Sequence, residues 1–154
     1  MRDGGKQAVL WKPASGGKVE CFLCGWRCAI AEGKTGRCGV RQNIGGELIS
    51  LAYGYPVALQ IDPIEKKPLA HFMPGTRTFS IGTFGCNLGC VFCQNHHLSR
   101  GTYQPRTKYK YYSPEDMVEL VLRHGCESIA FTYSEPTVFG EYAMDTAILA
   151  KKAG

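Results

Sequence analysis

Apolar and polar positions follow different patterns in the two halves of the chain. In the first half apolar residues come in short runs, and residues 47–61 predict two short strands interrupted at Gly54 and Pro56. After residue 75 the apolar runs are longer and alternate between strand and helix periodicity. They predict, in order, a strand, a helix, a strand and a helix at residues 78–84, 113–125, 127–133 and 138–152.

The helix predicted at residues 113–125 carries signals at both ends. Ser113 can cap its N-terminus, Pro114 suits its first turn, and the acidic residues that follow complement the helix dipole. Gly125 marks its end. A helix between two buried strands predicts a parallel, right-handed crossover connection.

Two β/α units do not close a barrel, because a full eight-unit barrel takes about 250 residues. The chain ends where a third strand is expected, so we expect either a fragment or a sheet that a partner completes. We predict an α/β fold in which residues 76–154 form the first two β/α units of a parallel barrel. Residues 1–75 are expected to form a small Cys-rich, metal-binding subdomain with short strands.

The Cys-rich subdomain has four closely spaced cysteines in a segment with little periodicity. Cys21, Cys24, Cys28 and Cys38 are separated by two, three and nine residues. Such a segment buries little apolar area and needs a metal to hold it together. Four thiolates suit a tetrahedral zinc ion, and they also suit a second iron–sulfur cluster. We predict a metal site here and leave both metals open.

Composition and cysteine content indicate a protein of a reducing compartment. The chain of 154 residues is 44% hydrophobic and 20% charged, without an apolar run that could span a membrane or act as a signal peptide. Seven of the eight cysteines fall into two tight groups, which is typical of metal or redox chemistry. We expect a cytoplasmic protein, with the lone Cys126 as a buried small hydrophobic residue.

The second group of cysteines follows the strand predicted at residues 78–84. Cys86, Cys90 and Cys93 lie in the stretch FGCNLGCVFCQNHH, and no fourth cysteine follows in the same loop. Three thiolates can hold three corners of a four-iron cluster and leave the fourth iron free for another ligand. The alternative is a zinc loop completed by His96 or His97.

The spacing Cys86-x3-Cys90-x2-Cys93, with Phe92 between the last two, resembles the signature of the radical S-adenosylmethionine superfamily. The resemblance implies a radical SAM barrel with a 4Fe-4S cluster whose open iron binds S-adenosylmethionine. It further implies reductive cleavage of this cosubstrate to a 5′-deoxyadenosyl radical, which abstracts hydrogen from the substrate. No side chain is then itself a catalytic group, because the cofactors carry the chemistry.

A second motif is expected at the same end of the sheet. The stretch TYSEPT, residues 132–137, resembles the Gly-Gly-Glu type motif of this superfamily, with Tyr133 and Ser134 in place of the two glycines. The resemblance implies that Ser134 and Glu135 contact the amino group of S-adenosylmethionine. It also implies that Phe92 lies against the adenine and that Asn95 helps to bind the cosubstrate. The alternatives are a helix cap at Ser134 and core packing of Phe92.

The motifs together resemble the radical enzymes of the AmmeMemoRadiSam system, which are relatives of pyruvate formate-lyase activating enzymes. The resemblance runs from about Cys21 to the end of the chain, and family members are roughly twice as long. It implies a protein or peptide substrate, with a glycyl-radical activase as one form, and an electron donor such as flavodoxin or ferredoxin. The stretch DPIEKKPLAHF, residues 62–72, holds four candidate functional residues, Glu65, Lys66, Lys67 and His71. These side chains either face the barrel mouth, as the family pattern implies, or belong to a solvated turn.

Two other functions are weighed against this hypothesis. The basic, tyrosine-rich segment from Arg100 to Tyr112 could bind RNA by charge and stacking, although a solvated loop is favoured and nucleic acid is not the expected partner. A non-catalytic iron–sulfur module would fit a truncated barrel. In either case no membrane partner is expected.

Overall fold

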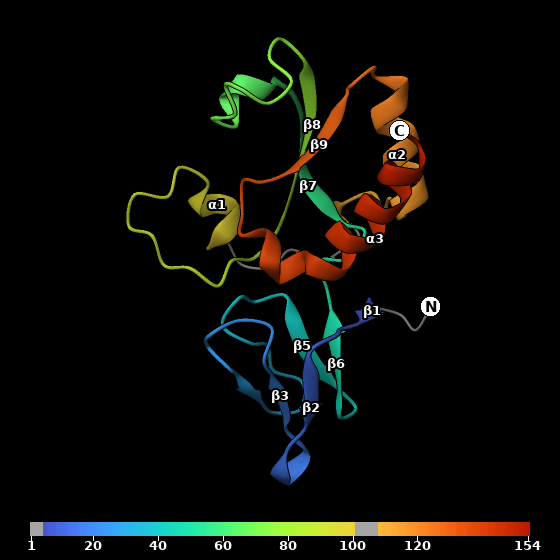
Figure 1. The fold of residues 1–154 in the computed structure, drawn as a ribbon. Coiled ribbons are helices and arrows are strands. Elements are labelled where there is room, and N and C mark those ends of the chain that lie inside the picture. Colours follow the sequence, from blue (N-terminus) through green and yellow to red (C-terminus); the bar gives the residue numbers. More distant parts are fainter. Residues whose placement is uncertain (1–4, 101–107) are drawn as a thin grey trace.

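Three small sheets organise the fold within residues 5–100 and 108–154, the part of the chain that the computed structural model describes (Figure 1). Two sheets lie in the N-terminal half and are antiparallel. One has the order β2-β3-β4 and the other β1-β6-β5. Their strands are β1 (Lys6–Gln7), β2 (Trp11–Pro13), β3 (Val19–Cys21), β4 (Ala29–Ile30), β5 (Arg41–Ile44) and β6 (Glu47–Ser50).

The third sheet carries the C-terminal half. Its order is β7-β8-β9, with β7 (Pro56–Pro63) antiparallel to β8 (Arg77–Thr83) and β8 parallel to β9 (Ser128–Phe131). The two strands expected within residues 47–61 are confirmed as β6 and β7, and those after residue 75 as β8 and β9. Because β7 precedes residue 75 and pairs with β8, the third sheet extends across the expected boundary. The division into residues 1–75 and 76–154 stays a prediction.

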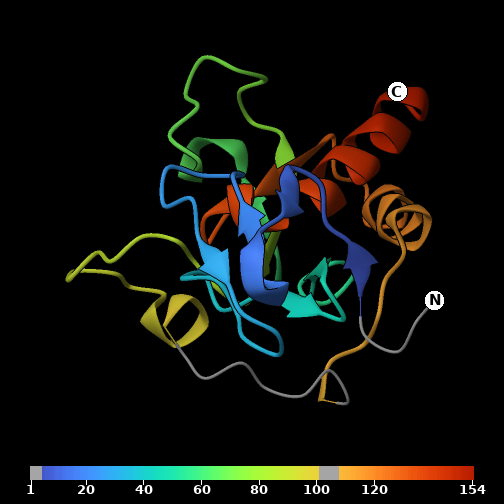
Figure 2. The same cartoon turned by 90° about the horizontal axis from the view of Figure 1, so that it is seen from below.

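The helices connect and cover the third sheet. The helix α2 (Pro114–Arg123) begins with a capping box in which the Ser113 hydroxyl accepts the Asp116 N–H at 3.1 Å. Gly125, with a φ of 60°, follows its end, as expected. In Figures 1 and 2, α2 lies beside α3 (Gly140–Lys152) on one side of the molecule, and α1 (His96–Ser99) lies on the other. Short 3-10 helices occupy Ser15–Gly17, Ile64–Lys66 and Pro136–Phe139.

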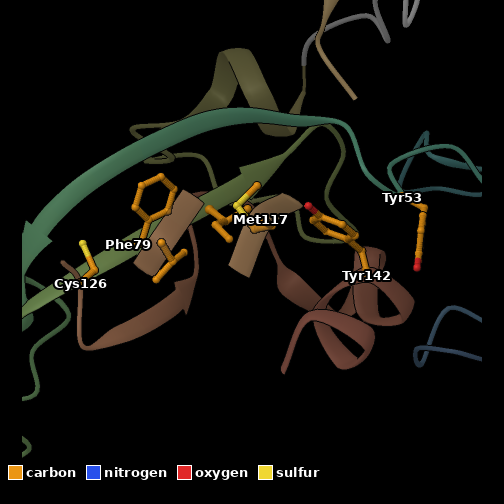
Figure 3. Close-up of a cluster of buried hydrophobic side chains, with 7 residues drawn as sticks. Tyr53, Phe79, Met117, Cys126 and Tyr142 are labelled. Atoms are coloured by element: carbon orange, nitrogen blue, oxygen red, sulfur yellow. The ribbon is translucent and has the colours of Figure 1, made fainter. Parts of the chain in front are cut away.

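A hydrophobic core fills the space between the third sheet and the helices α2 and α3 (Figure 3). Phe79 of β8 packs in one cluster with Met117 of α2, Tyr142 of α3 and Cys126. Cys126 is only 6% exposed, and burial raises the pKa of its thiol. It is therefore the buried small hydrophobic residue that the sequence predicts.

A buried ion pair joins the two halves of the molecule. Arg41 of β5 and Glu141 of α3 pair at 2.8 Å, with both side chains 2% exposed. The Arg41 guanidinium also donates to the Val9 carbonyl at 2.7 Å, and the Val9 N–H donates to the Glu141 carboxylate at 2.8 Å. Each buried charge is paired with the other and hydrogen-bonded to the backbone of Val9. The ion pair therefore connects β5, α3 and the N-terminal segment.

Candidate functional site

The three-cysteine loop begins directly after β8. Gly85, the residue before Cys86, has a φ of 87°, and a Cβ there would lie 2.5 Å from the Cys38 carbonyl oxygen. Only glycine fits both the backbone conformation and this close approach. The loop is further tied to the N-terminal half by the Trp26 indole, which donates to the Asn87 carbonyl at 2.8 Å. The loop that carries Cys86, Cys90 and Cys93 thus starts from a fixed position.

A cavity of about 320 Å³ brings together the two motifs that the sequence places far apart. Cys86, Cys90 and Cys93 line it from the loop after β8, with Asn95 beside them. Ser134 and Glu135 line it from the turn after β9. Since β8 and β9 are parallel neighbours, their carboxyl ends meet at one edge of the sheet, where ligands bind in such sheets. Four further residues line the cavity: Thr132 and Tyr133, which belong to the TYSEPT stretch, and Leu88 and Ser99, to which sequence analysis assigns no role.

The sulfur atoms of the loop are available as ligands. All eight cysteines are free, and Cys90 is exposed. The Leu88 N–H donates to the Cys86 sulfur at 3.4 Å, and the Cys93 sulfur lies 3.4 Å from the Ser99 hydroxyl. Such hydrogen bonds tune the potential of iron–sulfur clusters. Within residues 5–100 and 108–154 no group of three or more His, Cys, Asp or Glu side chains is already arranged to hold a metal ion. The donor set of three thiols on one cavity nevertheless fits a cluster with one open iron.

The turn after β9 is held by hydrogen bonds to the sheet. The Ser134 hydroxyl donates to the Thr83 carbonyl of β8 at 2.8 Å and is buried. The Glu135 carboxylate accepts the Thr137 hydroxyl at 2.6 Å and the Thr137 N–H at 3.4 Å. The alternative that Ser134 caps the following helix is therefore wrong, because Glu135 holds the cap position of the 3-10 helix and Ser134 bonds to the strand instead.

Phe92 and the two histidines lie apart from this arrangement. Phe92 is 83% exposed, so the alternative of core packing is wrong. Its contact with adenine stays a prediction. His96 and His97 are on α1, and neither lines the cavity, which gives no support to a zinc loop completed by them.

The four cysteines of the N-terminal half line a second, much smaller cavity. Its volume is about 20 Å³, close to the space that one small ion or water occupies. The four thiols are those of Cys21, Cys24, Cys28 and Cys38. Burial raises the pKa of the Cys38 thiol, although hydrogen bonds from the backbone of Val40 and the charge of Arg41 oppose this. Two of the buried polar atoms without a hydrogen-bond partner, Arg41 Nε and Asn87 Oδ1, belong to residues that line the same cavity.

The charged turn after β7 is exposed at Glu65, Lys66 and His71, and ion pairs and hydrogen bonds attach part of it to the rest of the protein. Lys66 and Lys67 both pair with Asp62, at 2.6 Å and 2.7 Å, and the Glu65 carboxylate accepts the Gly75 N–H at 2.7 Å. Burial alone would raise the pKa of Asp62. Hydrogen bonds from both lysines and from two hydroxyl groups hold that pKa well below its usual value instead. His71 is exposed, and a role for its side chain at the barrel mouth stays a prediction.

The tyrosines of the basic segment pack inside the protein where the structure describes them. Tyr109 contacts Phe84 with ring centroids 5.3 Å apart, and Tyr111 contacts Tyr55 at the same distance. Tyr103 and Arg106 lie outside the described residues. Rings that pack on their own protein are poor platforms for bases, so these contacts do not favour RNA binding.

Comparisons with known proteins show a similarity to one superfamily in the second half of the chain. Residues 80–154 match the family described as the radical SAM superfamily. The uncharacterized protein MJ0808 of Methanocaldococcus jannaschii is 41% identical over 150 residues, which cover 97% of this chain and 44% of that protein. The chain thus spans less than half the length of this relative. No solved structure matches. No helix in the described parts of the chain has the length and apolar character needed to cross a membrane.

Proposed function

We propose, from the radical SAM superfamily domain at residues 80–154, that the protein is a radical enzyme with a 4Fe-4S cluster and S-adenosylmethionine as cofactors. The observation that carries the proposal is the shared cavity of about 320 Å³ at the carboxyl ends of β8 and β9. Cys86, Cys90 and Cys93 would hold three irons. The fourth iron would be left for the cosubstrate, with Ser134 and Glu135 lining the same cavity.

When bound, the cluster and S-adenosylmethionine would supply one-electron reductive cleavage of the cosubstrate and hydrogen abstraction from the substrate. The role of this chain is to bind, orient and exclude water. Asn95, Ser134 and Glu135 line the same cavity as the three thiols, which supports a role for them in orienting the cosubstrate. The exposed ring of Phe92 is free to cover the adenine once the cosubstrate is bound.

We further propose that the protein is related to the radical enzymes of the AmmeMemoRadiSam system and to pyruvate formate-lyase activating enzymes. The motifs from Cys21 to TYSEPT support this narrower assignment. They favour a protein or peptide substrate, with flavodoxin or ferredoxin as electron donor. Because the chain spans 44% of its relative MJ0808, these are proposals about the whole protein.

The proposed activity is testable without a substrate. We expect the full-length protein, reconstituted with iron and sulfide under anaerobic conditions and reduced with dithionite, to convert S-adenosylmethionine to equal amounts of methionine and 5′-deoxyadenosine. Liquid chromatography with mass detection measures both products. A cluster-loaded protein that forms neither product above the level of a protein-free control would contradict the proposal.

We propose a separate metal site at Cys21, Cys24, Cys28 and Cys38. The fit rests on four free thiols around one small cavity and on the unpartnered Nε of Arg41 beside it. A metal-bound thiolate would accept a hydrogen bond from this buried donor, and the guanidinium would offset part of the negative charge. Zinc and a second iron–sulfur cluster both suit four thiolates.

Replacing Cys24 by serine is expected to remove this metal and to lower the melting temperature. In so loop-rich a segment the free energy of metal binding contributes directly to the free energy of folding. Elemental analysis measures the loss, and absorbance in the visible range separates colourless zinc from iron–sulfur. Cys126→Ser is the matched control and should keep the full metal content. Equal metal content in Cys24→Ser and the wild type would rule out Cys24 as a ligand.

We propose a cytoplasmic location from the cysteines. Eight free thiols, seven of them grouped in two potential metal sites, suit a reducing compartment.

A further inference from the structure

Tyr133 has a backbone conformation that side chains rarely adopt. Its φ is 68°, in the left-handed region that favours glycine. It is the residue before Ser134, and the Ser134 N–H donates across it to the Thr132 carbonyl at 2.9 Å. A tyrosine held in this conformation needs contacts elsewhere that stabilise it.

The tyrosine hydroxyl supplies such a contact, 71 residues away in sequence. It donates to Asp62 Oδ2 at 2.9 Å, and Asp62 is 5% exposed on β7. The same carboxylate accepts Ser80 of β8 at 2.8 Å and is paired with Lys66 and Lys67. The Lys67 ammonium also lies 5.0 Å from the centre of the Tyr133 ring. The ring is thus fixed at its hydroxyl and on its face.

β8 leaves room for this arrangement at Gly82. A Cβ at Gly82 would lie 2.9 Å from both the Thr132 carbonyl oxygen and the Tyr133 Cβ. The turn therefore sits directly on the strand that leads into the cysteine loop. Its position depends on β7, through Asp62, and on β8, through Gly82 and the bond from Ser134 to Thr83.

We propose that Asp62 and Tyr133 are positioning residues for the cosubstrate: the Tyr133–Asp62 hydrogen bond holds the turn in the conformation that presents Ser134 and Glu135 to the amino group of S-adenosylmethionine. This rests on the proposed function. The proposal also gives the charged segment after β7 a role at the site. Lys66 and Lys67 lower the pKa of Asp62, so that its carboxylate is ionised and accepts a hydrogen bond from the Tyr133 hydroxyl.

The test is the equilibrium dissociation constant of labelled S-adenosylmethionine, measured by dialysis on the full-length protein with its cluster oxidised, so that no cleavage occurs. Tyr133→Phe removes only the hydroxyl and should raise the dissociation constant by about tenfold or more, as the loss of one hydrogen bond to a charged group implies. Iron content and melting temperature should stay close to wild type.

Ser80→Ala is the matched control, because it deletes another hydrogen bond to the same carboxylate and leaves the Tyr133 hydroxyl in place. It should bind within about twofold of wild type. A dissociation constant for Tyr133→Phe within this twofold range would overturn the proposal. Equal weakening in Ser80→Ala and Tyr133→Phe would also overturn it, because the effect would then belong to the Asp62 network as a whole. Failure of the wild type itself to bind would instead overturn the proposed function, and this inference with it.

Discussion

Alanine in place of Cys86, Cys90 or Cys93 is expected to abolish cleavage of S-adenosylmethionine, with a loss of more than about 100-fold, since even partners outside the ligand shell cost 10–100-fold. Each substitution would remove one of the three thiols that line the cavity, and the loop itself has no fourth cysteine. We expect the iron bound by this site to fall together with 5′-deoxyadenosine production. Iron analysis and product chromatography on the same samples measure both.

Cys126→Ala is the control for this series. Cys126 is 6% exposed in the hydrophobic core, away from the cavity, and its loss should reduce stability without reducing iron content. Product formation by a Cys90→Ala protein at the wild-type rate would contradict the assignment of the loop as the cluster site.

The largest stability effect is expected at the buried ion pair. Glu141→Ala leaves the Arg41 guanidinium without its carboxylate in a site that is 2% exposed, and it also removes the acceptor of the Val9 N–H. Breaking one partner of a buried pair costs about 3–5 kcal/mol, because an uncompensated charge remains buried. Denaturant unfolding monitored by circular dichroism measures the loss.

A matched exposed pair offers the comparison. Arg123 and Glu119 pair at 2.7 Å on α2, with side chains 66% and 69% exposed. Glu119→Ala should cost no more than about 1 kcal/mol, since water and salt screen such pairs. A similar decrease in the free energy of unfolding for Glu119→Ala and Glu141→Ala would show that burial does not make the Arg41–Glu141 pair more important for stability.

The elements with local signals could be predicted from the sequence. Ser113, Pro114 and Gly125 bracket α2, and short apolar runs mark β8 and β9, because caps and periodicity depend only on neighbours in the chain. The three cysteines and the TYSEPT turn were likewise visible, and the parallel order of β8 and β9 was enough to expect them at one edge.

Contacts between distant residues could not be predicted in the same way. Nothing near Asp62 indicates that its carboxylate accepts the hydroxyl of Tyr133, and nothing near Glu141 indicates that it pairs with Arg41. The sequence alone allows Ser134 to cap the helix that follows β9. In the structure the Ser134 hydroxyl donates to the Thr83 carbonyl instead, and Glu135 caps the 3-10 helix Pro136–Phe139. Tertiary contacts decided each of these cases.

Electron paramagnetic resonance of the dithionite-reduced, cluster-loaded protein, recorded before and after addition of S-adenosylmethionine, tests the central claim most directly. The claim is that the loop at Cys86, Cys90 and Cys93 leaves one iron open for the cosubstrate. A spectrum that shifts on addition of S-adenosylmethionine is the predicted result. A four-iron signal that S-adenosylmethionine leaves unchanged would contradict the account.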